Sequence, residues 1–248
     1  MAEYATRADG LMLRTLMERE TCTLTHFLAD TETGEAVVID PVDVMADRDT
    51  LLLQELGFKL VYALNTHVHA DHITGTAQLK KRNAGCQSVI AEVSGARADV
   101  KVKHGDEIAF GKFKLQVRST PGHTDGCVTY VLTDETMAFT GDALLVRGCG
   151  RTDFQQGDSR KLYQGVWREV LSLPDSCALY PGHDYKGRFM TTVGEEKKYN
   201  LRLTKSEDEF VEIMANLGLA PPKYLDVALP ANMVCGYHEE GPVEAEAE

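Results

Sequence analysis

The N-terminal part of the chain, residues 11–40, consists of short apolar or alternating runs separated by turn residues. Two of these runs cover residues 21–28 and 36–40, and Asp, Thr and Gly residues fill the turn at 30–34. Runs of this length with turn residues between them are typical of strands joined by tight connections. We therefore expect antiparallel strands in this region.

The next segment changes from strand spacing to helix spacing. Residues 47–56 carry leucines on one side of a helix, and Gly57 follows at the position where glycine commonly ends one. The continuous apolar run at 59–64 predicts a strand, and the pattern at 74–82 predicts a second helix. Residues 66–72, between this strand and helix, are predominantly polar.

Strands and helices alternate through the rest of the chain. Strands are predicted at residues 88–91, 106–110, 112–118, 127–132, 137–140 and 177–180, and a helix at 160–171. Another helix is predicted from the capping box at 206–209, with Phe210, Ile213, Met214 and Leu217 on its buried side and Gly218 at its end. Two β-rich halves with flanking helices indicate an α/β fold in which two sheets pack face to face with helices outside. We expect residues 1–236 to form this single domain and the acidic tail, residues 237–248, to be disordered.

The charge balance excludes one class of partner. Of the 248 residues, 26 are basic and 38 are acidic, which gives a net charge of −12 at pH 7. This negative charge argues against a nucleic-acid surface. No apolar run approaches the roughly 20 residues that a membrane-spanning helix requires, so no membrane partner is expected.

The cysteines bear on the cellular compartment. Six cysteines lie scattered along the chain without a CxxC pair, at positions 22, 86, 127, 149, 177 and 235. This spacing favours free thiols in a reducing compartment, and most free cysteines are small core residues. The first residues have neither a signal-peptide apolar region nor the acid-poor character of a transit peptide. We therefore expect a cytoplasmic protein.

Residues 66–72 read Thr-His-Val-His-Ala-Asp-His directly after the apolar run at 59–64. A single histidine in such a segment is usually an ordinary polar residue, but three histidines and an aspartate within seven residues indicate a metal site. Imidazole and carboxylate are ligands for zinc, iron and manganese. His123, Asp142 and His183 each lie beside a glycine just after another strand-like run, so strand ends carry every candidate ligand.

This series of motifs resembles the metallo-β-lactamase superfamily, and the resemblance covers the chain to about residue 236. The run at 138–157, which contains Gly-Cys-Gly-Arg-Thr-Asp-Phe, is similar to the persulfide dioxygenases of that superfamily, and so is Pro-Ala-Asn-Met-Val-Cys-Gly at 230–236. The resemblance implies a four-layer αβ/βα sandwich of two mixed β-sheets with helices on the outer faces. It also implies an oxidoreductase that incorporates both atoms of O₂.

For this group the resemblance implies a single ferrous iron held by His67, His123 and Asp142. Such a set leaves positions on iron open for substrate and O₂. The neighbouring candidates then orient ligands and water by hydrogen bonds, or they bind a second metal as in dinuclear relatives. These neighbours are His69, Asp71, His72 and His183. No catalytic side chain beyond the metal centre is expected, and the role of Cys235 stays open.

The substrate implied by the resemblance is glutathione persulfide, which O₂ and water convert to sulfite and glutathione. Arg151 and Tyr185 occupy positions where the neighbouring glyoxalase II family binds glutathione, since an Arg clamps a carboxylate and a Tyr hydroxyl reaches peptide groups. The alternative reading of Arg151 is an ion pair with Asp153 or Asp184. The alternative function is a glyoxalase II-like dinuclear thioesterase that hydrolyses glutathione thioesters. A homodimer and a separate sulfurtransferase partner are also expected.

Overall fold

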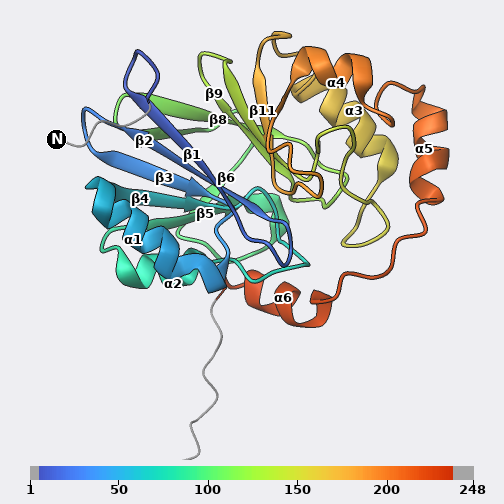
Figure 1. The fold of residues 1–248 in the computed structure, drawn as a ribbon. Coiled ribbons are helices and arrows are strands. Elements are labelled where there is room, and N and C mark those ends of the chain that lie inside the picture. The colour runs from blue at the N-terminus through green and yellow to red at the C-terminus, as the bar shows by residue number, and fades with distance from the viewer. Residues whose placement is uncertain (1–5, 237–248) are drawn as a thin grey trace, which may run out of the picture.

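The computed structural model describes residues 6–236, which fold into two sheets flanked by helices (Figure 1). The acidic tail for which disorder is predicted lies outside the described residues. Among the described residues no helix combines the length and apolarity needed to cross a bilayer.

The first sheet contains six strands that follow one another in sequence order. They are β1 (Leu11–Met17), β2 (Leu24–Asp30), β3 (Glu35–Ile39), β4 (Lys59–Leu64), β5 (Gln87–Ala91) and β6 (Val100–Val102). β1 to β3 pair antiparallel, as predicted for residues 11–40, whereas β3 to β6 pair parallel. The sheet is therefore mixed.

The second sheet also contains six strands, in the order β12-β11-β10-β9-β8-β7. They are β7 (Glu107–Phe110), β8 (Phe113–Ser119), β9 (Val128–Leu132), β10 (Met137–Gly141), β11 (Ala178–Pro181) and β12 (Thr191–Thr192). The two predicted hairpins are present as the antiparallel pairs β7–β8 and β9–β10, and β10 runs parallel to β11. Because β8 and β10 each pair antiparallel with β9, their carboxyl ends lie at the same edge as that of β11.

The apolar core lies between the two sheets. Leu28 and Val37 of the first sheet are fully buried and belong to the same cluster as Leu115, Tyr130 and Phe139 of the second. Alternating side chains of each strand reach this core because successive residues of a strand face opposite sides of its sheet. The second face of each sheet is then left for helices to cover.

Helices cover the outer face of each sheet, which completes four layers (Figure 1). α1 (Ala46–Leu56) and α2 (Thr76–Arg82) bury Leu53 and Leu79 against the first sheet. α3 (Ser159–Glu169), α4 (Val193–Tyr199) and α5 (Glu207–Ala215) lie on the second sheet, where Leu162 and Phe210 are buried. The remaining helical segments are the short η1 (Asp43–Met45) and η2 (Glu92–Ser94) and the C-terminal α6 (Leu225–Asn232).

Two helices differ from what the sequence predicts. The capping box of Ser206 and Glu209 is present, but α5 ends at Ala215 with Asn216 as its C-cap, whereas we had expected the helix to continue to Gly218. α6 was not predicted, because its short apolar segment contains Pro230, which lacks a backbone donor and usually argues against a helix interior. α6 packs beside α2 and the loop after β4, through the backbone bond from Ala77 N to the Cys235 carbonyl just beyond its end.

Candidate metal centre

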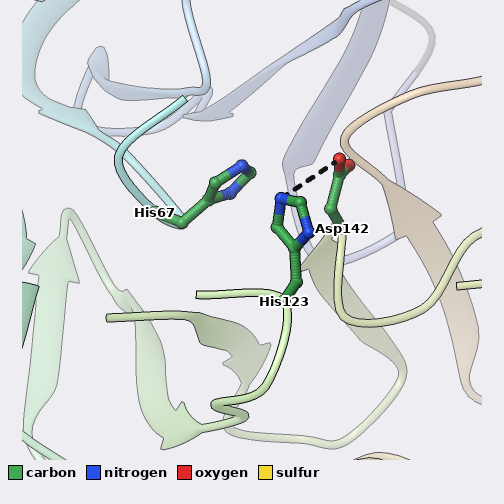
Figure 2. Close-up of side chains that lie close together, drawn as sticks. All are labelled: His67, His123 and Asp142. Carbon is green, nitrogen blue, oxygen red and sulfur yellow. Dashed lines mark ion pairs between the residues drawn. The ribbon is translucent and has the colours of Figure 1, made fainter. Parts of the chain in front are cut away.

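Three side chains from three strand ends point toward one another (Figure 2). His67 follows β4, His123 follows β8 and Asp142 follows β10. Each offers one ligand atom, and these atoms all lie within 4.8 Å of one another. Nε2 of His123 lies 3.8 Å from Oδ2 of Asp142. The fold thus brings two imidazoles and one carboxylate to a single point, which is the donor set of a facial two-histidine, one-carboxylate site.

Hydrogen bonds fix the protons on both imidazoles. Nδ1 of His123 lies 2.6 Å from the Arg151 carbonyl oxygen, and Nδ1 donates because a carbonyl oxygen only accepts. Nδ1 of His67 lies 3.0 Å from the Thr66 hydroxyl. That hydroxyl donates to Oδ2 of Asp40 at 2.8 Å, so it accepts from His67. Both rings therefore carry their proton on Nδ1 and keep the Nε2 lone pair for a metal ion.

The carboxylate of Asp142 is held in its charged form. Its Oδ1 accepts a hydrogen bond of 2.7 Å from Nδ1 of His183. Burial alone raises the pKa of Asp142, but the charge and hydrogen bond of His183 outweigh burial and lower this pKa below the ordinary aspartate value. Oδ2 takes no part in that bond and faces His123. An ionised carboxylate beside two free Nε2 atoms fits a divalent metal ion.

His183 joins Asp142 to a second carboxylate. Its Nε2 lies 2.7 Å from Oδ2 of Asp71. Burial lowers the pKa of His183, but Asp142 and Asp71 together raise it well above the ordinary histidine value. A protonated imidazolium donates both of its N–H groups, one to each carboxylate. His183 therefore aligns the Asp142 carboxylate from the side opposite His123.

His69, Asp71 and His72 form a second group whose ligand atoms also lie within 4.8 Å of one another. Nδ1 of His69 and Nε2 of His72 are buried, and neither has a hydrogen-bond partner among the described residues. Buried nitrogens without partners are what a second ion would satisfy. Asp71, however, is already engaged by His183 and by Nδ1 of His72, at 2.7 and 3.2 Å. The group therefore has the ligand atoms that a second metal ion requires. It also has hydrogen bonds that can orient the ligands of a single ion.

Asp40 is a site residue that our reading of the sequence missed. It follows β3 and is buried, and its carboxylate accepts from the Thr66 backbone N–H at 2.7 Å and from Nε2 of His69 at 3.1 Å. Burial opposes its charge, but the neighbouring His69 lowers the pKa of Asp40 to about 2. The available signal was an acidic residue that ends the apolar run at 36–40, the same pattern that pointed to Asp142.

A cavity of about 560 Å³ opens above the candidate metal centre. His123, Asp142 and His183 lie in its wall, together with the basic side chains Arg147, Arg151, Lys186 and Arg202. Apolar side chains complete the lining, among them Leu145, Phe154 and Leu219. A concave site of this size with a few convergent polar groups suits a small-molecule ligand.

Both residues predicted to bind substrate line this cavity. The guanidinium of Arg151 forms a two-pronged ion pair with Asp153, with both hydrogen bonds at 2.7 Å, and this is the pair that the alternative interpretation named. It also donates to the carbonyl oxygens of Leu219 and Ala220. Tyr185 is 65% exposed and stacks parallel to the His183 ring, with ring centroids 6.0 Å apart. Arg151 thus braces the cavity wall, whereas the Tyr185 side chain is accessible to a ligand.

Comparisons with known proteins agree with this geometry. The model of the metallo-β-lactamase superfamily matches residues 25–183. The persulfide dioxygenase ETHE1 of Mus musculus, which is named as mitochondrial, is 55% identical over 236 residues, or 95% of this chain and 93% of that protein. The crystal structure of ETHE1 from Myxococcus xanthus has a TM-score of 0.88 at 47% identity and covers 91% of this chain and 100% of that chain. A hydroxyacylglutathione hydrolase of Brucella ovis is only 32% identical over 217 residues, or 85% of this chain and 80% of that protein.

These likenesses confirm the family and the fold expected from the motifs, including two mixed sheets with helices on their outer faces. Identity is much higher with the mouse persulfide dioxygenase than with the thioester hydrolase, and it extends over nearly the whole chain. The chain therefore belongs to the persulfide dioxygenase family, a group of oxidoreductases within the metallo-β-lactamase superfamily.

Proposed function

We propose that this persulfide dioxygenase oxidises glutathione persulfide at one ferrous iron ion held by His67, His123 and Asp142. In the overall reaction glutathione persulfide, O₂ and water give glutathione, sulfite and two protons. The observation that supports this most directly is the pair of Nε2 lone pairs beside an ionised carboxylate at the wall of a ligand-sized cavity. Iron held by the two histidines and the carboxylate would supply the redox chemistry of the reaction.

The side chains around the metal ligands hold these ligands in position and orient them. His183 keeps Asp142 aligned through its 2.7 Å hydrogen bond, and Thr66 keeps the proton of His67 on Nδ1. No side-chain nucleophile is needed for this reaction. Cys235 in particular is buried, and burial raises the pKa of its thiol, which favours a structural role.

Glutathione carries two carboxylates, and the cavity offers two basic side chains that have no carboxylate partner among the described residues. Arg147 pairs with two glutamates of α4, and Arg151 pairs with Asp153. Arg202 is half-buried, and among the described residues its guanidinium donates only to the Cys149 carbonyl at 3.0 Å and, more weakly, to sulfur atoms. Lys186 is exposed at the rim. We therefore assign a substrate carboxylate to Arg202. Arg151 and Tyr185, the substrate-binding residues predicted from the sequence, line the wall beside it, and the Tyr185 hydroxyl reaches peptide groups of the ligand.

Replacing Arg202 with Met should raise KM for glutathione persulfide about 10-fold or more and leave kcat nearly unchanged, because a charge-assisted hydrogen bond to bound substrate is lost. Oxygen uptake is measured with glutathione persulfide and with 2-mercaptoethanol persulfide, which has no carboxylate. The Arg151→Met variant serves as the comparison, and it should change KM for both substrates because it loosens the wall. An equal effect of Arg202→Met on both substrates would contradict the assignment.

Metal analysis combined with oxygen uptake tests the proposed function. Anaerobically purified protein should contain one iron ion per chain and consume O₂ only when a persulfide such as glutathione persulfide is added. The products sulfite and glutathione are quantified in the same reaction. Protein with two zinc ions per chain that hydrolyses glutathione thioesters and takes up no oxygen would instead be a glyoxalase II-like enzyme.

Four further predictions from the sequence belong to this proposal. Buried side chains shared by both sheets support one domain over residues 1–236, of which residues 6–236 are described. All six cysteines are free, which supports a reducing compartment such as the cytoplasm, although the mammalian relatives are named as mitochondrial. The homodimer and the separate sulfurtransferase partner stay predictions.

A further inference from the structure

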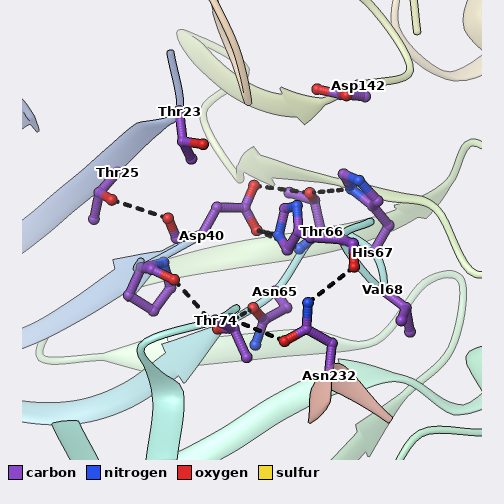
Figure 3. Close-up of polar contacts among 12 residues, drawn as sticks. Thr23, Thr25, Asp40, Asn65, Thr66, His67, Val68, Thr74, Asp142 and Asn232 are labelled. Carbon is purple, nitrogen blue, oxygen red and sulfur yellow. Dashed lines mark hydrogen bonds and ion pairs between the residues drawn. The ribbon is translucent and has the colours of Figure 1, made fainter. Parts of the chain in front are cut away.

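Asn232, the last residue of α6, uses both polar atoms of its side chain to bind the main chain of the metal loop, residues 66–74. Figure 3 shows Asn232 beside Thr74 of this loop. Its Nδ2 donates to the carbonyl oxygens of His69 and His72 at 2.9 and 2.8 Å. Its Oδ1 accepts from the Thr74 backbone N–H at 2.9 Å. The residue is 3% exposed, so water does not share these bonds. One buried amide therefore satisfies three backbone groups of a loop some 160 residues away in the sequence.

These three bonds fix the turn that carries Asp71. Two carbonyl oxygens converge on a single NH₂ group, so the backbone between His69 and His72 has little freedom to open. Asp71 lies within this turn, and its carboxylate holds His183 at 2.7 Å. His183 in turn holds Asp142 at 2.7 Å. Asn232 is thus connected to the carboxylate of the candidate metal centre through the backbone of the turn and the two hydrogen bonds of His183.

The C-terminal segment is itself anchored just beyond Asn232. The backbone N–H of Ala77 in α2 donates to the Cys235 carbonyl at 3.1 Å. Gly236 adopts a positive φ of 80° and approaches the Thr74 carbonyl so closely that a Cβ atom at this position would clash with it. Asn232 is therefore presented to the loop by a rigid segment. The superfamily match ends at residue 183, so this contact comes from outside the part that the superfamily model describes.

We propose that Asn232 is a positioning residue of the metal centre, acting through Asp71 and His183 on the orientation of Asp142. The proposal rests on the proposed metal ligands. Losing the amide donors leaves the carbonyl oxygens of His69 and His72 buried without partners, so the turn rearranges to satisfy them. Asp71 then moves with the turn, and the metal loses the alignment of its carboxylate ligand.

The test uses the full-length chain with Asn232→Leu and Asn232→Asp. The first variant removes all three hydrogen bonds at similar volume, and the second keeps an acceptor for Thr74 but places negative charge against two carbonyl oxygens. Leu53→Ala is the matched control, because it opens a cavity under α1 on the far face of the first sheet and lowers stability without touching the loop. Thermal unfolding of the metal-free proteins shows how closely the stability losses match.

Iron affinity is measured anaerobically by competition with a chelator, and the ferrous site is probed by the electron paramagnetic resonance spectrum of its nitric oxide complex. Both Asn232 variants should bind iron about 10- to 100-fold more weakly and give an altered spectrum, as for the loss of other outer hydrogen-bond partners of metal ligands. Leu53→Ala should lower Tm and change neither the iron affinity nor the spectrum. Wild-type iron affinity and spectrum in Asn232→Leu or Asn232→Asp would overturn the proposal.

These readouts separate the inference from the proposed function. If the wild-type protein binds two zinc ions and hydrolyses thioesters, the proposed function fails. Zinc competition with the same variants still reports on the loop, and weaker zinc binding in the Asn232 variants alone supports a positioning role at that centre. Equal zinc affinity in all variants would contradict a positioning role of Asn232.

Discussion

The Asp142→Ala protein should bind no stoichiometric iron and show no oxygen uptake with glutathione persulfide. Asp142 supplies the one carboxylate of the proposed ligand set, and its removal also leaves Nδ1 of His183 without its partner. The site then loses both a ligand atom and the negative charge that balances a cation. The loss should exceed the roughly 10- to 100-fold that removal of an outer hydrogen-bond partner costs.

The measurement pairs iron content after anaerobic reconstitution with oxygen uptake. Asp134→Ala is a suitable control, because Asp134 lies in the turn before β10 and its side chain is 42% exposed. This control should retain full iron and activity. If Asp142→Ala keeps stoichiometric iron, Asp142 is not a ligand and the proposed set is wrong.

Asp40→Ala is the second variant for which we expect a large loss of iron affinity, although Asp40 is not one of the proposed metal ligands. The Asp40 carboxylate accepts a hydrogen bond from the Thr66 hydroxyl, and that hydroxyl accepts one from Nδ1 of His67. Without the carboxylate, Thr66 can donate to Nδ1, which shifts the proton of His67 to Nε2 and blocks that nitrogen as a ligand. His69 and the Thr66 backbone N–H also lose a charged partner, so stability should fall by about 3 kcal/mol.

Chelator competition and chemical unfolding of the metal-free protein measure the two effects separately. Thr66→Val is informative beside Asp40→Ala, since it removes the hydroxyl but leaves the bond from Asp40 to His69. Thr129→Val serves as control, because among the described residues the Thr129 hydroxyl bonds only Thr120, at 3.2 Å. Iron affinity in Asp40→Ala equal to that of the wild type would show that the tautomer of His67 does not depend on Asp40.

Much of the architecture follows from local patterns. The leucines before Gly57, the capping box at Ser206 and the alternation in the two hairpins each specify an element without help from the rest of the chain. The elements that were missed, such as β12 and α6, are short or contain a proline. Their stability comes from tertiary packing, which a local pattern does not contain.

The sequence by itself determined the chemistry of the site. Each candidate ligand follows an apolar strand, and the series of motifs resembles a family whose ligand set matches His67, His123 and Asp142. The structure brings the ligand atoms of these three residues within 4.8 Å of one another, although His67 follows a strand of the first sheet and the other two follow strands of the second. Sequence similarity also identified the family. These features are local or are carried by motifs.

Only the tertiary structure decided which residues support the metal ligands. It also decided which basic side chains of the cavity lack a carboxylate partner among the described residues. Asp40 and Asn232 reach the metal loop from 26 and about 160 residues away, and Arg151 proved to be paired with Asp153 whereas Arg202 is not paired with a carboxylate. Buried hydrogen bonds and ion pairs depend on which segments the fold brings within about 3 Å. Residue order does not encode that distance locally, and packing of the two sheets and α6 sets it.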